Sequence, residues 1–202
     1  MLKHQCLTVI IGIEINHKLK TIMKPLNVPT KDQVNDNAKA IFENLEKKLG
    51  MVPNIYATIG YSGDVLKSYM DFDSSTGNTF SMKEKETIKL AVSEVNGCNY
   101  CLAAHTAVAK QNGFSEEDTL KLRDGSIEDE KLRTLSRLAT ETAKNAGKIS
   151  EESRDAFFEL GYEEKDLIDF IAVVLSVTFT NLVHNVTEIP VDFPEAKELE
   201  LV

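Results

Sequence analysis

Two cysteines and a histidine lie within eight residues of one another near the middle of this chain. Cys98 and Cys101 are three positions apart, and His105 follows the second cysteine by four. An Asn-Gly pair directly before Cys98 indicates that a helix begins there. On a helix, residues three or four positions apart share a face, so the two sulfurs can meet and His105 can lie one turn beyond Cys101. The spacing therefore predicts a redox-active dithiol.

The predicted helix start also affects the acidity of the two thiols. Unpaired N–H groups and the helix dipole favour a thiolate over a thiol. A thiolate attacks a peroxide or a partner's disulfide, and with a peroxide the resulting sulfenic acid condenses with the second cysteine. Cys101 is the better candidate for the attacking thiolate because His105 lies next to it. Cys98 would then be the resolving thiol, which condenses with the sulfenic acid. The opposite order stays open, because Cys98 is closer to the helix N-terminus.

Other uses of a Cys-x-x-Cys pair fit the sequence less well. A c-type haem attachment needs a histidine directly after the second cysteine, where this chain has Leu102. A thioredoxin-like site needs a strand before the motif, whereas the residues on both sides here have helical periodicity. A zinc site needs about four ligands, and Cys98, Cys101 and His105 supply three. Two alternatives therefore remain. One is a zinc site with a carboxylate as its fourth ligand, and the other is a pair of buried structural cysteines.

A histidine that acts as a base usually has a carboxylate to orient it and to hold its charge. If the helices on either side of Gly97 form an antiparallel hairpin, Glu86 lies roughly level with His105, while Glu94 lies closer to the turn. Helical periodicity alone does not choose between these two glutamates. Another histidine, His184, is interpreted as a hydrogen-bonded structural residue.

Apolar periodicity, capping residues and glycine stops predict an all-α chain with no strands. Start signals include Asp64, a capping box at Ser81 and Glu84, and Ser126. The apolar run Phe170–Val177 indicates a buried central helix or an oligomer contact, and it is too short to span a bilayer. The expected helices cover residues 37–49, 55–59, 64–72, 81–96, 98–112, 115–124, 126–146, 150–160 and 163–187.

Composition narrows the class of protein. A net charge of −9 without a Lys/Arg cluster argues against a nucleic-acid or membrane partner. Three cysteines are too few for a secreted disulfide framework, so a reducing, cytoplasmic location is expected. The apolar stretch within residues 1–22 is short and lacks a signal-peptide cleavage site. We therefore expect residues 1–22 to be a disordered or non-native extension and residues 23–202 to be a single domain.

The run from Glu86 to His105 resembles the carboxymuconolactone decarboxylase/AhpD-like superfamily, and more closely its alkylhydroperoxidase-like, peroxidase-related branch. That family has a glutamate twelve residues before the first cysteine, then Cys-x-x-Cys, and a histidine four residues after the second cysteine. This chain matches all four positions. The resemblance implies Glu86 as the relay carboxylate and Cys101 as the peroxide-reactive thiol, with Cys98 resolving. One departure is Tyr100, which stands where the founding alkylhydroperoxidase has a histidine.

The same resemblance implies a fold, an activity and partners. The fold would be an AhpD-like helical bundle, with the Cys-x-x-Cys at the N-terminus of a helix in a central antiparallel helical hairpin, assembled as a homo-oligomer. The activity would be reduction of alkyl hydroperoxides with a dithiol reductant, which is a lipoyl- or thioredoxin-like protein or a small thiol. No cofactor and no bound metal are expected. The alternatives are a carboxymuconolactone decarboxylase-type enzyme, whose members generally lack the cysteine pair, and a non-catalytic redox- or zinc-responsive binding protein.

Overall fold

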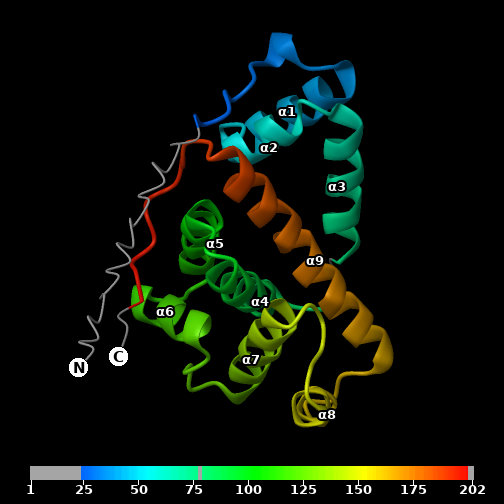
Figure 1. The fold of residues 1–202 in the computed structure, drawn as a ribbon, viewed down its shortest axis with the longest axis vertical. Helices are drawn as coiled ribbons and strands as arrows, with labels where there is room; N and C mark the ends of the chain where they lie inside the picture. The colour runs from blue at the N-terminus through cyan, green and yellow to red at the C-terminus, as the bar shows by residue number, and fades with distance from the viewer. Residues whose placement is uncertain (1–23, 77–78, 200–202) are drawn as a thin grey trace, which may run out of the picture.

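The computed structural model describes residues 24–76 and 79–199, and all regular secondary structure in these ranges is helical (Figure 1). This confirms the prediction of an all-α fold. The predicted extension, residues 1–22, lies outside the described residues. The elements are η1 (Lys31–Gln33), α1 (Asp36–Leu49), α2 (Asn54–Ile59), α3 (Gly63–Ser75), α4 (Met82–Val95), α5 (Asn99–Gln111), α6 (Glu116–Asp124), α7 (Glu130–Lys144), α8 (Glu151–Glu159) and α9 (Glu164–Thr187).

Capping side chains explain where several helices begin. The Ser81 hydroxyl accepts a hydrogen bond from the Glu84 N–H at 3.3 Å, and the Glu84 carboxylate accepts one from the Ser81 N–H at 2.6 Å. This is the predicted capping box, and such a cap stabilises a helix by about 1 kcal/mol. The prediction for α7 was wrong by a few residues. Asp129, rather than Ser126, is its cap, because the Asp129 carboxylate accepts from the Leu132 N–H at 2.9 Å.

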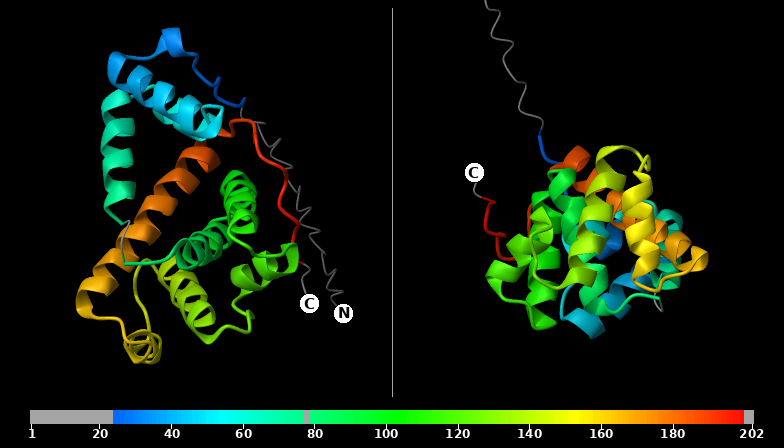
Figure 2. Two further views of the ribbon diagram at one scale, coloured as in Figure 1. Left: turned by 180° about the vertical axis from the view of Figure 1, so that it is seen from behind. Right: turned by 90° about the horizontal axis from the view of Figure 1, so that it is seen from below.

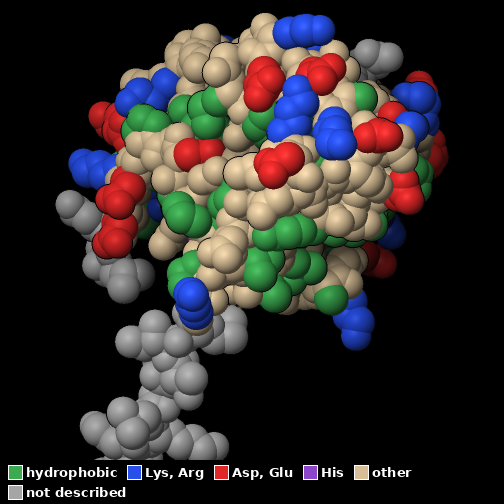
Figure 3. All heavy atoms as spheres, turned by 90° about the horizontal axis from the view of Figure 1, so that it is seen from above, with side chains coloured by type: hydrophobic (Ala, Val, Ile, Leu, Met, Phe, Trp, Pro, Cys, Tyr) green, Lys and Arg blue, Asp and Glu red, His purple; other side chains and the backbone are tan. Residues whose placement is uncertain are grey.

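Helices α1, α2 and α3 pack together at one end of the molecule (Figure 2). Asp64, predicted to cap α3, lies instead in its first turn, where its carboxylate accepts from the Asn37 side chain of α1 at 2.6 Å. Phe42 and Leu66 are buried in a core that these helices share with the start of α5. Viewed from this end, the surface shows interspersed acidic and basic side chains beside a group of apolar ones (Figure 3).

Helix α4 is the central element, because it contacts α5, α6, α7 and α9. Its buried apolar side chains point to more than one side: Ile88 and Val92 pack with α7 and α9, and Leu90 packs in a second cluster with α5 and α6. All three are 0% exposed. Full burial of such a side chain contributes about 1.5–3 kcal/mol. These contacts hold α4 rigidly behind α5, the helix that carries the cysteine motif.

Helix α9 crosses the molecule obliquely and ends beside α2 (Figure 1). Phe170, Val173 and Val177 on its inner side lie in the main core. Among the described residues, α9 is the single helix long and apolar enough to cross a membrane by length and composition, but it is packed here as a core helix. The prediction of a buried central helix therefore holds for its inner side. Its outer side remains exposed.

The segment after α9 is extended and is fixed to the helices by polar contacts. The Asp192 carboxylate accepts a hydrogen bond from the Asn54 N–H at 2.7 Å, and the Lys197 carbonyl accepts one from the Arg123 guanidinium at 2.5 Å. The Phe193 ring packs edge-on against Tyr100, with 5.7 Å between ring centroids. The tail therefore covers the start of α5.

Candidate functional site

Cys98 is the N-cap residue of α5, and Cys101 lies in the first turn of that helix. Gly97, with a φ of 60°, allows the abrupt turn between α4 and α5, because this backbone region is unfavourable for residues with a Cβ. The Cys98 sulfur accepts a hydrogen bond from the Cys101 N–H at 3.3 Å. Both thiols are free and buried, with 0% of Cys98 and 3% of Cys101 exposed. The motif therefore forms a reduced dithiol below the surface.

The surroundings of the two sulfurs give the Cys98 and Cys101 thiols different pKa values. The hydrogen bond from the Cys101 thiol, together with interactions with His184 and the Cys101 N–H, lowers the pKa of Cys98 to about 5 despite burial. The same Cys98 charge raises the pKa of Cys101, and burial raises it further. The two pKa values therefore move in opposite directions, and Cys98 is the more acidic thiol of the pair.

His105 and Glu86 form a close pair between α5 and α4. The Nδ1 atom of His105 lies 2.8 Å from the Glu86 Oε2 atom. Glu86 is 2% exposed, so solvent weakens this contact little. A carboxylate at Nδ1 holds the ring in the tautomer whose Nε2 atom is free to accept a proton. The structure thus brings together the two residues that the motif predicts as a relay.

Glu94, the other glutamate considered, has a different partner. Its carboxylate lies 2.7 Å from the Nε atom of Arg123 on α6, and the Arg123 side chain is 3% exposed. The ion pair fastens α4 to α6. Helical periodicity did not separate Glu86 from Glu94, but their partners do, because Glu86 contacts His105 and Glu94 contacts Arg123.

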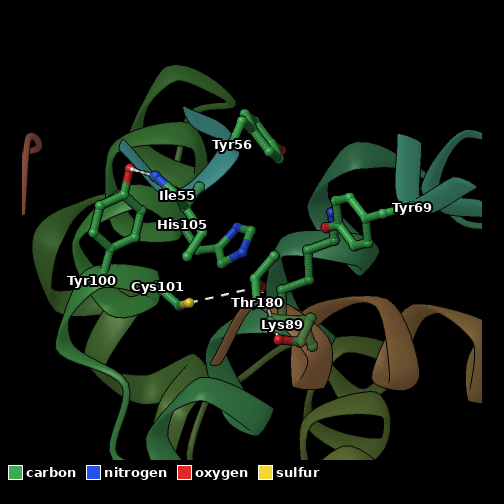
Figure 4. Close-up of a pocket in the computed structure, with 9 residues that line it drawn as sticks. Ile55, Tyr56, Tyr69, Lys89, Tyr100, Cys101, His105 and Thr180 are labelled. Atoms are coloured by element: carbon green, nitrogen blue, oxygen red, sulfur yellow. Dashed lines mark hydrogen bonds between the residues drawn. The ribbon is translucent and has the colours of Figure 1, made fainter. Parts of the chain in front are cut away.

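A cavity of about 40 Å³ opens beside Cys101 (Figure 4). Cys101 and His105 both line it, whereas Cys98 does not. A space of this size holds a few water-sized molecules, because one water needs about 10–15 Å³ of such volume. The cavity lining consists of Ile55, Tyr56, Tyr69, Lys89, Tyr100, Cys101, His105, Val177 and Thr180. A small peroxide in this cavity would meet the Cys101 sulfur.

Five helices, α2, α3, α4, α5 and α9, supply polar groups to this cavity. Burial raises the pKa of the Tyr56 and Tyr69 phenols, which keeps them protonated as donors. Lys89 lies 3.6 Å from the Asp73 carboxylate. The Thr180 hydroxyl, on α9, lies 3.8 Å from the Cys101 sulfur. The sequence analysis missed Lys89 and Thr180, whose only signal was a polar residue within an apolar helical run.

Among the described residues, no group of three or more His, Cys, Asp and Glu side chains is arranged to hold a metal ion. The donors considered for zinc are engaged otherwise: His105 contacts Glu86, and Cys98 accepts from the Cys101 N–H.

Comparison with known proteins shows which family model and which folds this chain resembles. Residues 63–128, which contain all four motif residues, match the model of the carboxymuconolactone decarboxylase family. Solved structures with the same fold include AhpD-like, peroxidase-related proteins. Residues 63–128 therefore resemble the carboxymuconolactone decarboxylase family, and the fold is that of AhpD-like proteins, in agreement with the predicted resemblance.

Three similar structures show how far the likeness extends. An uncharacterized peroxidase-related protein from Silicibacter sp. TM1040 is 25% identical, with 86% of this chain and 95% of that chain covered and a TM-score of 0.70. An uncharacterized peroxidase-related protein with an alkylhydroperoxidase AhpD core, from Ralstonia eutropha JMP134, is 20% identical, with coverages of 83% and 92% and a TM-score of 0.73. The debrominase Bmp8 is 19% identical, with coverages of 85% and 92% and a TM-score of 0.68. No curated protein sequence matches the chain.

Proposed function

We propose that this protein is a thiol-dependent peroxidase that reduces small hydroperoxides with the Cys98–Cys101 pair. The observation that carries the proposal is the position of Cys101 and His105 on one cavity, with Glu86 2.8 Å behind the His105 ring. A nucleophile, a base and an orienting carboxylate in this order are what thiol catalysis requires. The peroxidase-related relatives support the same class of chemistry.

The proposed first step oxidises Cys101. His105 takes the Cys101 proton while the sulfur attacks the outer peroxide oxygen, so that an S–O bond forms and the O–O bond breaks. The leaving alkoxide, or hydroxide from hydrogen peroxide, then receives the proton from His105. Cys101 becomes a sulfenic acid, and Cys98 condenses with it to a disulfide. Glu86 stabilises the transient imidazolium and keeps its ring in place.

A dithiol must then reduce the disulfide. Because both sulfurs are buried and the cavity is narrow, the arrangement favours a small dithiol or a slender lipoyl-like arm over a thioredoxin-like protein. The reaction requires a reducing compartment, in keeping with a cytoplasmic location. If the protein were a lactone decarboxylase, the dithiol would have no role in the reaction. If it were a non-catalytic redox protein, it would not consume peroxide over repeated cycles.

The direct test is steady-state consumption of hydrogen peroxide or a small alkyl hydroperoxide with dithiothreitol or dihydrolipoamide as the donor. We expect turnover that depends on protein concentration and is lost after the thiols are alkylated. Consumption no faster than with the donor alone would reject the peroxidase and favour the non-catalytic alternative.

We also propose that the exposed side of α9 joins two copies of this chain. Its large apolar side chains fall within a narrow stripe along the helix, beside a groove of about 510 Å³ between α3 and α9. Contiguous apolar surface of this kind marks an interface in soluble proteins. The stripe consists of Ile168, Ile171, Leu175, Leu182 and Val186, which are 47–67% exposed.

Replacing Leu175 and Leu182 with aspartate is therefore expected to convert an oligomer to monomers. Buried carboxylates facing each other across the interface would repel and lose hydration. Light scattering after gel filtration measures the mass. Leu49→Asp on α1 is the matched control, because Leu49 is as exposed as Leu175, at 57%, and lies outside the stripe. A wild-type protein that is already monomeric at micromolar concentration would contradict the proposed interface.

A further inference from the structure

The C-terminal part of α9 lies over the loop that carries Cys98. The Asn181 side chain donates to the Ser93 hydroxyl at 3.1 Å and accepts from the Asn96 side chain at 2.8 Å. One turn later, the Asn185 side chain donates to the Asn96 carbonyl at 2.8 Å. This polar face of an otherwise apolar helix fixes the α4–α5 turn. His184 lies on the same stretch of α9.

The His184 ring interacts with the Cys98 sulfur as well as with Asn185 and the Ile189 backbone, so the prediction of a hydrogen-bonded structural histidine left out its contact with the cysteine pair. The His184 ring lies 5.4 Å from the Tyr100 ring, between centroids, so it is held against the Cys-x-x-Cys segment. Its Nδ1 atom is buried and has no hydrogen-bond partner. Burial lowers the pKa of His184, but the neighbouring Cys98 sulfur, the Asn185 side chain and the Ile189 backbone outweigh this and raise it above its usual value. An anion beside a histidine ring favours the cationic form of the ring, and a cationic ring favours the anion in turn.

A negative charge on the Cys98 sulfur needs a stabilising partner within the protein. Cys98 is 0% exposed and does not line the cavity, so water cannot solvate a charge on its sulfur. A buried anion without a partner is strongly disfavoured. The groups that act on the Cys98 sulfur are the thiol and N–H of Cys101, from α5, and the His184 ring, from α9. The cation at the cavity, Lys89, lies on the Cys101 side and pairs with Asp73.

We propose that His184 is a positioning residue that holds Cys98 as a thiolate for the disulfide-forming step, which rests on the proposed peroxidase function. In that step the Cys98 thiolate attacks the sulfur of the Cys101 sulfenic acid. An S–S bond forms, the S–O bond breaks, and hydroxide leaves. His184 loses its anionic neighbour and releases a proton, which converts the hydroxide to water. His105 therefore governs oxidation of Cys101, and His184 governs closure of the disulfide.

The test separates these two steps in a single turnover. Reduced wild type and His184→Gln are mixed with hydrogen peroxide, sulfenic acid is trapped with dimedone, and disulfide is counted by mass spectrometry. We expect His184→Gln to form the Cys101 sulfenic acid at nearly the wild-type rate but, below about pH 5, to close the disulfide up to about tenfold more slowly, because a rise of about one unit in the Cys98 pKa lowers its thiolate fraction about tenfold there. His184→Lys, which keeps a cation, is expected to restore part of the closure rate.

Phe193→Leu is the matched control, because Phe193 packs on Tyr100 as His184 does but has no charge. Equal slowing in His184→Gln, His184→Lys and Phe193→Leu would show a purely structural role and overturn the proposal, as would closure at the wild-type rate in His184→Gln. A second measurement needs no peroxidase activity: the ultraviolet absorbance of the Cys98 thiolate against pH. Its midpoint should rise by about one unit in His184→Gln, and an unchanged midpoint would also reject the proposal. A wild type that forms no sulfenic acid would reject the peroxidase instead.

Discussion

Cys101→Ser is expected to abolish peroxide consumption, with a fall of at least about 10³-fold in the steady-state rate. Cys101 is the sulfur on the cavity, and a serine hydroxyl is a far weaker nucleophile toward a peroxide oxygen than a thiolate. We do not expect Cys98 to substitute, because it is fully buried and does not line the cavity. The measurement is peroxide consumption with dithiothreitol in excess, with circular dichroism to verify that the variant is folded.

Cys98→Ser provides the contrast within the same pair. This variant is expected to consume one equivalent of peroxide and then stop, with the sulfenic acid trapped on Cys101, because the resolving thiolate is gone. The reversed outcome, in which Cys101→Ser accumulates a sulfenic acid on Cys98, would interchange the two roles. That outcome is a real alternative, because Cys98 is the more acidic thiol in this structure.

Glu86→Gln is expected to lower kcat/KM by about 10²-fold or more, in the range that general-base catalysis contributes. The amide is nearly the same size as the carboxylate, but it carries no charge to stabilise the His105 imidazolium and can present a donor to Nδ1. Because Glu86 is buried behind the ring, solvent cannot replace it. Initial rates across a range of peroxide concentrations measure the effect.

Glu94→Gln is the matched control on the same helix. It weakens the ion pair with Arg123 and leaves that guanidinium buried beside a neutral partner, so we expect a loss of stability without a loss of turnover per folded molecule. Thermal unfolding and initial rates measured on the same samples separate the two effects. Equal losses of activity in Glu86→Gln and Glu94→Gln would contradict the relay.

Local signals predicted most of the helices. The capping box at Ser81 and the glycine turn before Cys98 act within one or two helical turns, so sequence alone reveals them. The start of α7 was misplaced because Ser126 and Asp129 are both good caps, and the choice depends on tertiary packing. In the structure, the Ser126 N–H donates to the Asp124 carboxylate, which leaves Asp129 to begin the helix.

The site was only partly predictable, for a different reason. Cys98, Cys101 and His105 are neighbours along one helix, so their spacing reports their proximity. Thr180 and His184 come from α9, about 80 residues later in the chain, and no periodicity links them to the motif. Tyr100 stands where the founding alkylhydroperoxidase has a histidine. In this structure a histidine from another helix, His184 of α9, packs against the Tyr100 ring.

The most direct test of the central claim is a titration of the reduced wild-type protein with hydrogen peroxide in the absence of any donor. We predict that one equivalent of peroxide per chain is consumed and that both thiols of the pair are lost together. Peptide mapping should then show a disulfide between Cys98 and Cys101. Free thiols at both positions after excess peroxide would contradict the assignment of this pair as the peroxide-reducing centre.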